Sequence, residues 1–389
     1  MKLLPILLSL LLFTGCTAKQ QPPQPSSVPP ETTLPAVTAH QTIPTEPPTQ
    51  LPTQSPPDPI REMLDAMSLP QRVGQLFLAR CDDSVALAHI EAFHLGGFVL
   101  FGRDFDGQTP DSFREKITAY QNAAKIPLLL AVDEEGGTVT RVSSNPAFAS
   151  ARFPSPRTAF RQGGLENVLT VEEEKCQLLR SLGLNVNLGP VCDMADDPAA
   201  FLYERSFGED PDTTGQYITE TVTLMRSFGI GSCLKHFPGY GNNADTHTGI
   251  ARDSRALWQL EERDLLPFAS GIASGCGATM VSHTIVEAMD ASLPASLSPA
   301  VHRYLRENMG FSGVIMTDDL SMQAITDCYG AGEAAVMAVL AGNDLLCSTD
   351  YVTQYEAVLA AVLDGRIDID TLNKAVRNVL QWKMDLGLI

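Results

Sequence analysis

Eight short apolar runs, separated by segments long enough for helices, constrain the fold of this chain more than any other feature of its sequence. Because these runs lack polar alternation, they are typical of parallel strands that are buried on both faces. Eight strand–helix units over about 330 residues predict an α/β fold, a (β/α)8 barrel of the TIM type in a single domain. The alternative is an open doubly wound sheet, but no G-x-G-x-x-G fingerprint opens a strand–helix turn. The predicted strands are residues 73–79, for which a helix is the alternative, 96–101, 127–133, 185–190, 231–236, 278–283, 313–318 and 343–347.

The N-terminus has the pattern of a bacterial lipoprotein signal peptide over residues 1–16. Lys2 precedes a mostly apolar run of 13 residues, 3–15, which is too short to span a bilayer as a helix but suits a signal peptide. Gly15 is a small residue before Cys16, as in lipoprotein cleavage sites, where the cysteine becomes lipidated. We therefore expect an exported, extracytoplasmic protein that is lipid-anchored to the cell membrane. Ordinary secretion and an uncleaved anchor are the alternatives.

Residues 17–59 are rich in Pro, Thr and Gln and contain 13 of the 27 prolines of the chain. Such a segment buries too little apolar surface to offset the entropy of ordering it, and its prolines favour extended backbone. We therefore expect a disordered tether over residues 17–59, followed by one folded domain over residues 60–389.

The charge of the chain argues against one class of partner. The formal net charge is −19, from 46 acidic and 27 basic residues, and no cluster of Lys and Arg is visible. A surface that binds phosphate groups needs such clusters. Nucleic acid is therefore not an expected partner. We also expect the protein to be a monomer.

Seven cysteines follow Cys16, and several lie inside apolar runs. No Cys-x-x-Cys pair is present, so the sequence does not predict a structural zinc site, and no metal or cofactor is expected. We expect most of these cysteines to be small buried hydrophobes. They are Cys81, Cys176, Cys192, Cys233, Cys276, Cys328 and Cys347.

Ionisable residues gather where the predicted strands end. Asp133 ends one run, Lys235 and His236 end another, His283 ends a third and Asp318 with Asp319 ends a fourth. Function in a (β/α)8 barrel lies at the C-terminal ends of the strands, and four such ends are more than helix capping explains. The sequence therefore predicts an active site at this end of the barrel.

The loop after the strand at 231–236 carries the most specific pattern. Its residues 235–241 read K-H-F-P-G-Y-G, in which Pro and two Gly prevent the strand from continuing as a helix. Asp245 and His247 follow as D-T-H. A carboxylate beside an imidazole fixes the tautomer of the ring and stabilises its protonated form, as general acid–base catalysis requires.

Together these residues resemble the K-H-F-P-G-x-G…D-S-H signature of glycoside hydrolase family 3, and the resemblance covers nearly all of residues 60–389. Within that family the pattern is similar to bacterial exo-β-N-acetylglucosaminidases of the NagZ type. Tyr240 stands where that subgroup usually has His, Thr246 replaces the usual Ser, and Asn242-Asn243-Ala244 replaces a stretch that normally starts with Asp. The matching segments are 67–76, 96–101, 133–137 with Arg141, 185–190, 205–208 before 210–211, and 317–322.

The resemblance implies a retaining enzyme that releases terminal β-linked N-acetylglucosamine from peptidoglycan fragments or chitin oligomers. Asp318 is implied as the nucleophile that forms a covalent glycosyl-enzyme, and His247, assisted by Asp245, as the acid–base. The residues implied to bind the sugar are Asp133, Arg141, Arg205, Lys235 and His236.

Four nearby residues have other interpretations. Successive strand residues point to opposite faces, so Asp318 and Asp319 should not both enter the barrel mouth, and we expect Asp319 to be a structural hydrogen-bond acceptor. His283 is either a ligand contact or a core histidine with satisfied hydrogen bonds. For Glu134 and Glu135 we expect hydrogen bonds with backbone amides near the following glycines.

Other functions remain alternatives to this one. A family 3 β-glucosidase generally takes its acid–base from a second domain and lacks the D-x-H loop. A phosphorylase would use the absence of a fixed negative charge on a His acid–base to admit phosphate. A metal-dependent barrel hydrolase would need ligand pairs such as H-x-H or H-E-x-x-H, which are not present. The non-enzymatic alternative is a sugar-binding lipoprotein.

Overall fold

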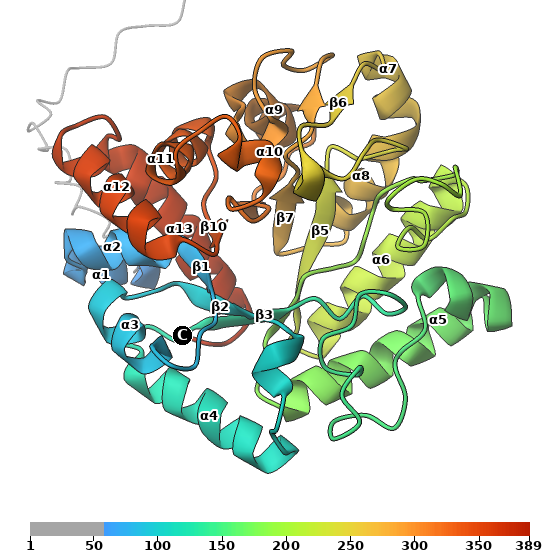
Figure 1. Cartoon of the computed structure of the whole chain (residues 1–389), viewed down its shortest axis with the longest axis horizontal. Helices are drawn as coiled ribbons and strands as arrows, with labels where there is room; N and C mark the ends of the chain where they lie inside the picture. The colour runs from blue at the N-terminus through green and yellow to red at the C-terminus, as the bar shows by residue number, and fades with distance from the viewer. Residues whose placement is uncertain (1–57) are drawn as a thin grey trace, which may run out of the picture. The chain divides into compact units, whose positions relative to one another are not determined.

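Within residues 58–389, the part of the chain that the computed structural model describes, eight parallel strands form one sheet that curls into a barrel (Figure 1). They pair in the order β10-β1-β2-β3-β4-β5-β7-β9. Met316 bridges Leu345 between β9 and β10, which closes the barrel and confirms the predicted (β/α)8 fold. The barrel strands are β1 (Phe77–Arg80), β2 (Gly97–Leu100), β3 (Leu129–Val132), β4 (Val186–Asn187), β5 (Gly231–Phe237), β7 (Ala278–Val281), β9 (Val314–Thr317) and β10 (Leu346–Ser348).

Each barrel strand overlaps the run that predicted it, but the first run is divided between a helix and a strand. Residues 73–75 belong to α2 (Leu69–Gln75), and β1 begins only at Phe77. The cause is a capping box, in which the N–H of Ser68 donates to Gln71 Oε1 at 2.8 Å and Ser68 Oγ accepts from the N–H of Gln71. This cap starts a helix before the apolar run begins.

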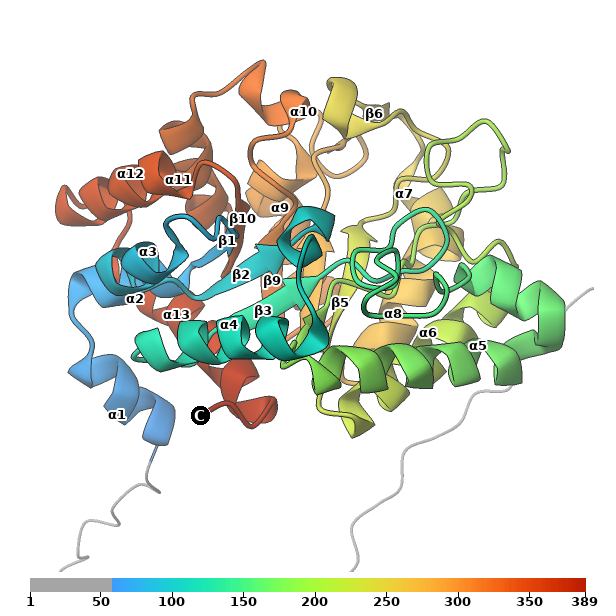
Figure 2. The same cartoon turned by 60° about the horizontal axis from the view of Figure 1, so that its bottom comes forward.

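Helices connect successive barrel strands and cover the outside of the barrel (Figures 1 and 2). A separate parallel pair, β6 (Arg252–Asp253) and β8 (Ile285–Val286), follows β5 and β7 in the chain. The helices are α1 (Pro59–Ala66), α2, α3 (Ala86–Phe93), α4 (Pro110–Ala123), α5 (Pro156–Ser181), α6 (Pro211–Ser227), α7 (Leu257–Gln259), α8 (Leu265–Ala273), α9 (Pro299–Arg303), α10 (Gln323–Thr326), α11 (Ala331–Ala341), α12 (Tyr351–Leu363) and α13 (Ile369–Asp385). Short 3₁₀-helices are η1 (Gly102–Phe105), η2 (Thr246–Thr248) and η4 (Ala295–Leu297), and short π-helices are η3 (Leu260–Asp264) and η5 (Tyr304–Asn308).

Strand β3 shows why the apolar runs lack polar alternation. Leu129 and Ala131 pack in a cluster that collects residues from all the barrel strands, which only the barrel interior allows. Leu130 and Val132, which point the other way, pack in the cluster that the outer helices cover. Both faces of the strand are therefore buried, as the composition of the run predicts.

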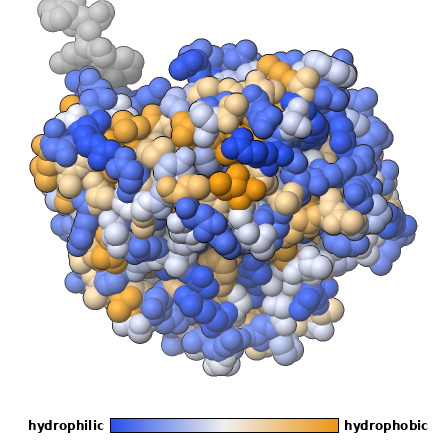
Figure 3. Space-filling model, turned by 45° about the horizontal axis from the view of Figure 1, so that its top comes forward, coloured by the Kyte–Doolittle hydropathy of each residue, from blue (hydrophilic) through white to orange (hydrophobic). Residues whose placement is uncertain are grey.

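The seven cysteines within residues 58–389 are free thiols. Six of them are buried, which confirms their interpretation as small hydrophobes, and Cys328 is exposed. On the face that Figure 3 shows, hydrophobic residues are scattered among hydrophilic ones. In residues 58–389 we find no helix with the length and apolarity that crossing a membrane requires.

The first helix, α1, begins at Pro59, and the side chain of Asp58 caps it by accepting from the N–H of Arg61 at 3.1 Å. It therefore starts one residue before the predicted beginning of the domain at residue 60. The predicted signal peptide, Cys16 and residues 17–57 of the predicted tether lie outside the described residues.

Candidate active site

A cavity of about 930 Å³ lies at the C-terminal ends of the barrel strands. Its lining combines residues that directly follow β3 and β9, residues within β5, and a histidine from the loop after β5. The fold therefore brings together side chains that are far apart in the sequence. Seven predicted site residues line the cavity, namely Asp133, Arg141, Arg205, Lys235, His236, His247 and Asp318.

A cluster of alternating charges forms one wall of the cavity. Lys235 Nζ lies 2.7 Å from Asp133 Oδ1 and 2.6 Å from Glu135 Oε1. Arg205 binds both oxygens of Glu135, with Nε 2.9 Å from Oε2 and Nη2 2.7 Å from Oε1. Arg141 is more distant, with Nη2 3.8 Å from Asp133 Oδ2. The cluster presents Asp133 and Arg141 to the cavity and holds Glu135 beneath them.

The charged side chains at the centre of this cluster are buried, so each depends on its neighbours to remain charged. Lys235 is 2% exposed and Glu135 is 6% exposed. Burial alone would raise the pKa of Glu135, but Arg205 and Lys235 hold it well below its usual range. Burial alone would lower the pKa of Lys235, but Asp133 and Glu135 raise it above its ordinary value. Each charged form is thus stabilised by its neighbours, and removing one member would leave the others uncompensated.

His236 is oriented by a carboxylate that the sequence analysis did not identify. Asp193 Oδ2 accepts from the backbone N–H of His236 at 2.9 Å and lies 2.7 Å from its Nδ1. The other ring nitrogen of His236, Nε2, lies 3.3 Å from Nη2 of Arg205. Asp193 is 1% exposed and comes three residues after the predicted strand at 185–190.

Asp245 and His247, which the sequence predicts as an acid–base pair, are in contact. His247 Nδ1 lies 2.7 Å from Asp245 Oδ1, which also accepts from the backbone N–H of His247 at 2.9 Å. This contact assigns the Nδ1 proton to the Asp245 side and leaves Nε2 for substrate. His247 lines the cavity, whereas Asp245 is not among the lining residues. The ring of Phe201 lies 6.1 Å from the ring of His247, centroid to centroid.

Asp318 directly follows β9 and lines the same cavity as His247. Burial alone would raise the pKa of Asp318, but His283, His236 and the N–H of Asp319 together hold it below its ordinary value. Burial lowers the pKa of His283, so its ring is neutral at neutral pH and does not then contribute a positive charge beside Asp318. At neutral pH the direct contact that favours the Asp318 carboxylate is the N–H of Asp319, which donates to Asp318 Oδ1 at 2.8 Å.

Asp319 is a structural acceptor, as expected. Its Oδ1 accepts from the N–H groups of Ser321 at 2.9 Å and Thr349 at 3.2 Å, and its Oδ2 accepts from Thr349 Oγ1 at 2.5 Å. The expectation that Asp318 and Asp319 do not both enter the barrel mouth was wrong, because both line the cavity. Strand alternation does not apply to them, since β9 ends at Thr317.

The structure decides the remaining alternatives among the neighbouring residues. His283 is a core histidine, fully buried, with Nδ1 2.7 Å from Ser296 Oγ and Nε2 3.0 Å from the carbonyl of Asp319. Glu134 accepts from the N–H groups of residues 141–143, as expected. The same expectation was wrong for Glu135, because the buried charges of Arg205 and Lys235 take its carboxylate.

A second group, Cys81, Asp83 and Asp104, has ligand atoms within 4.8 Å of one another. These residues do not line the cavity. Lys116 Nζ already lies 2.9 Å from Asp83 Oδ2 and donates to the carbonyl of Asp104 at 2.7 Å. Burial raises the pKa of the Cys81 thiol well above its usual range, which disfavours the thiolate that a metal would need. This group is therefore poorly suited to hold a metal ion.

Residues 68–382 match the family described as "Glycosyl hydrolase family 3 N terminal domain". The chain is 32% identical over 329 residues to the beta-hexosaminidase LpqI of Mycobacterium tuberculosis, covering 80% of this chain and 82% of that relative. It is 34% identical over 299 residues to a beta-hexosaminidase of Xylella fastidiosa strain M23, covering 74% and 86%.

Solved structures agree as well. The fold superposes with a TM-score of 0.77 on a glycoside hydrolase family 3 beta-N-acetylglucosaminidase from Paenibacillus sp. FPU-7, at 33% identity over 83% of this chain. The chain spans 63% of the length of that protein. It superposes on M. tuberculosis LpqI with a TM-score of 0.75 at 28% identity, covering 83% of this chain and 96% of that one. The chain therefore belongs to glycosyl hydrolase family 3 and is a glycoside hydrolase.

Proposed function

We propose that the protein is a retaining, exo-acting β-N-acetylglucosaminidase that removes terminal β-linked N-acetylglucosamine from peptidoglycan fragments or chitin oligomers. The observation that carries this proposal is the shared cavity, in which the carboxylate Asp318 and the His247–Asp245 pair accompany a wall of charged side chains. The names of the beta-hexosaminidase relatives support the same substrate class.

The first chemical step forms a glycosyl-enzyme. An oxygen of Asp318 attacks the anomeric carbon while the glycosidic C–O bond breaks, and Nε2 of protonated His247 gives its proton to the departing oxygen. An ester links the sugar to Asp318 at the end of this step. Asp245, 2.7 Å from Nδ1, stabilises the imidazolium that donates the proton.

The second step reverses these roles. Neutral His247 takes a proton from water, the water oxygen attacks the anomeric carbon, and the ester bond breaks to release Asp318 as a carboxylate. Two displacements at the same carbon retain the anomeric configuration.

The charged wall would hold the sugar in place for both steps. Asp133 accepts hydroxyl hydrogens, and Arg141, Lys235 and Arg205 donate to hydroxyl or acetamido oxygens. His236 has its ring set by Asp193, so its Nε2 faces Arg205 in one orientation. Because Glu135 and Asp193 lock these groups, little ordering is left for substrate binding to complete.

The test is a comparison of para-nitrophenyl β-N-acetylglucosaminide with the matching β-glucoside. We expect a higher kcat/KM for the N-acetylglucosaminide, and NMR of the first-formed sugar should show the β anomer. Preference for the glucoside would instead identify the protein as a β-glucosidase. Release of the α anomer as the first product would exclude the covalent route.

Phosphorolysis is the second candidate, and the cations of the cavity favour it. Besides Arg141, Arg205 and Lys235, the cavity is lined by Arg80, whose guanidinium lies 4.4 Å from the centroid of the Phe101 ring. A histidine acid–base also lacks the fixed negative charge that repels phosphate. Addition of inorganic phosphate to the same assay decides between the two, because only phosphorolysis yields the sugar 1-phosphate.

We also propose that Cys16 is lipidated and that residues 17–59 tether a monomeric enzyme domain to the extracytoplasmic membrane surface. The support is the sequence pattern of residues 1–16 and the proline content of the tether. Cell fractionation after metabolic labelling with an alkyne fatty acid tests the anchor. Cys16→Ser should abolish both the label and membrane retention, and unchanged retention would contradict the anchor. Light scattering of the soluble domain tests the monomer.

A further inference from the structure

His247 lies on a loop and not in the packed core, so its position depends on what anchors the loop. The His247 side chain is 58% exposed, whereas its partner Asp245 is 25% exposed. We call residues 238–251 the acid–base loop, and residues 192–210, between β4 and α6, the facing loop. An exposed side chain on an unanchored loop would spread over many positions, and small misplacements of a catalytic group are costly.

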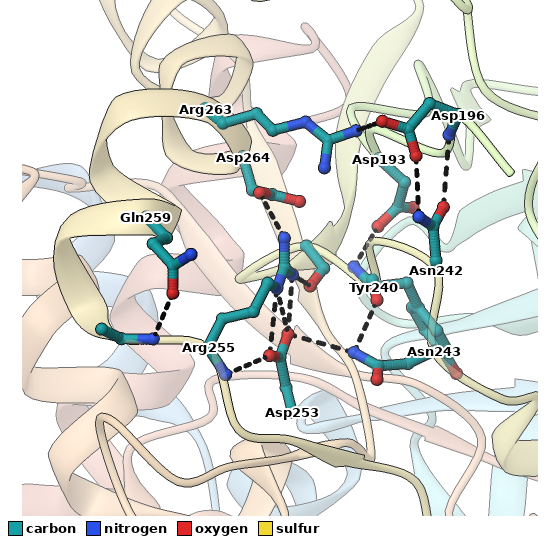
Figure 4. A network of polar contacts seen from close by, with 12 residues as sticks. Asp193, Asp196, Tyr240, Asn242, Asn243, Asp253, Arg255, Gln259, Arg263 and Asp264 are labelled. Carbon is teal, nitrogen blue, oxygen red and sulfur yellow. Dashed lines mark hydrogen bonds and ion pairs between the residues drawn. The ribbon is translucent and has the colours of Figure 1, made fainter. Parts of the chain in front are cut away.

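Asn242 joins the two loops through its whole side-chain amide (Figure 4). Its Oδ1 accepts from the N–H groups of Asp196 at 3.2 Å and Asp197 at 3.3 Å, and its Nδ2 donates to Asp196 Oδ1 at 2.7 Å. Arg263 in η3 holds the other oxygen of Asp196, with Nη2 2.9 Å from Oδ2. An aspartate at position 242 would place a second carboxylate against Asp196.

Tyr240 ties the start of the acid–base loop to the sugar-binding wall. Its N–H donates to Asp193 Oδ1 at 2.8 Å, and the other oxygen of Asp193 orients His236. Its hydroxyl shares a hydrogen bond with Thr246, the residue between Asp245 and His247. Tyr240 is 1% exposed and Thr246 is fully buried, so this buried contact holds the residue that separates Asp245 from His247.

Asn243 closes the loop on its return side. Its Nδ2 donates to the carbonyl of Tyr240 at 2.8 Å and to Asp253 Oδ2 at 3.0 Å. Arg255 binds Asp253 and also Asp264, with Nη1 2.6 Å from Asp264 Oδ2. The backbone between residues 240 and 253 is therefore held at both ends, as Figure 4 shows.

We propose that Tyr240, Asn242 and Thr246 are positioning residues. Their hydrogen bonds hold the acid–base loop against the facing loop and keep His247 at the glycosidic oxygen. The proposal rests on the proposed function. The chain departs from the family signature at these positions and at Asn243 and Ala244, and all of these residues except Ala244 make the contacts that anchor the loop. The facing loop contributes Asp193 and Asp196 as acceptors, and Phe201, whose ring also lies 6.1 Å from that of Tyr240.

The test measures kcat/KM, which reports the first chemical step, for an N-acetylglucosamine disaccharide and for a 2,4-dinitrophenyl N-acetylglucosaminide in the full-length protein. Only the disaccharide needs a well-placed proton donor. Asn242→Ala and Thr246→Val should each lower kcat/KM for the disaccharide by about tenfold or more and change that for the aryl glycoside by less than about twofold. Thr246→Ser, which keeps the hydroxyl, should retain disaccharide activity.

Asn122→Ala on α4, at an exposed position outside the cavity, is the matched control and should behave as the wild type. Equal losses on both substrates, or no loss on the disaccharide, would overturn the proposal. If Thr246→Val does not fold, the exposed Asn242→Ala still decides the question. If the wild type prefers glucosides, the proposed function fails. The same comparison with a glucoside series then still tests whether Asn242 and Thr246 position His247.

Discussion

At the scale of single residues, two adjacent carboxylates have opposite surroundings. Asp318 has one oxygen on the N–H of Asp319 and otherwise faces the cavity, whereas both oxygens of Asp319 are occupied by Ser321 and Thr349. A nucleophile must keep an oxygen free for the anomeric carbon, and a structural carboxylate must not. The two residues should therefore respond differently to the same substitution.

Asp318→Asn should lower kcat/KM on the order of 10⁴-fold or more without a change in Tm, because the amide cannot form the ester. Asp319→Asn should instead cost about 1–3 kcal/mol of folding free energy, because one acceptor oxygen becomes a donor facing Thr349. Steady-state kinetics and urea unfolding of both variants test this. An Asp319 variant that folds normally but is inactive would reverse the assignment.

His247→Ala should reduce kcat/KM about 10²–10⁴-fold for substrates with poor leaving groups and only slightly for activated aryl glycosides. Asp245→Asn should give a smaller loss, since the imidazolium that donates the proton loses its anionic neighbour. The measurement is rate against leaving-group acidity. Equal slowing of good and poor leaving groups would remove His247 from the acid role.

Glu135→Gln should destabilise the fold by about 3–5 kcal/mol, because the buried cations Arg205 and Lys235 lose their shared anion. The sign with pH follows from the lowered pKa of Glu135. Its stabilisation is present above the ordinary carboxyl range and is lost as pH falls toward the folded-state value. Urea unfolding at pH 7 and pH 4 should show a smaller difference between wild type and variant at pH 4. A constant difference would contradict the ion-pair account.

At the scale of elements, α2 and α13 join the two ends of the barrel domain through polar contacts. Arg72 Nη1 in α2 donates to Asn373 Oδ1 in α13 at 3.0 Å. Lys383 Nζ, fully buried in α13, donates to Gln75 Oε1 in α2 at 2.7 Å. Burial lowers the pKa of Lys383 from 10.5 to about 7.

Lys383→Met should stabilise the fold at pH 7 and below. The pKa decrease from 10.5 to about 7 corresponds to about 5 kcal/mol. Loss of the donor to Gln75 returns about 1–3 kcal/mol of that, which leaves a net gain of about 2–4 kcal/mol. Between pH 7 and 10.5 the unfolded lysine binds more protons than the folded one, so wild-type stability rises with pH and the gain shrinks. Urea unfolding at pH 7 and 9.5 checks this, and a pH-independent gain would argue against a buried titrating lysine.

At the scale of the whole molecule, the N-terminal helices belong to the barrel domain. Asp58 caps α1, and its Oδ2 lies 2.8 Å from Nη2 of Arg377 in α13. The domain is therefore held together from Asp58 onward.

A chain that begins at Pro57 should fold with the Tm and kcat/KM of the full-length protein, because the Pro-rich composition of the preceding residues suits a tether and not a packed core. A chain that begins at residue 68 should lose stability, since it lacks α1, whose Ile60 and Leu64 are buried. Thermal melts and kinetics of both chains test this boundary. Reduced activity of the chain that begins at Pro57 would show that residues before 57 take part in the fold.

The sequence by itself determined the barrel and the end of it at which the cavity lies. Buried parallel strands require apolar runs, and strand ends with ionisable residues are visible in the order of the chain. The same rule would have found Asp193, which follows the predicted strand at 185–190 as Asp133 ends the one at 127–133. The capping box at Ser68 was also readable, because its two partners are three residues apart.

Only the tertiary structure decided how the charges are paired. Glu134 and Glu135 are neighbours in the chain, yet one binds backbone N–H groups of residues 141–143 and the other binds Arg205, 70 residues away. Asn242 meets Asp196 across 46 residues. Such contacts depend on where the loops after β4 and β5 lie once the barrel has closed, and local periodicity, capping and turn signals carry no information about that placement.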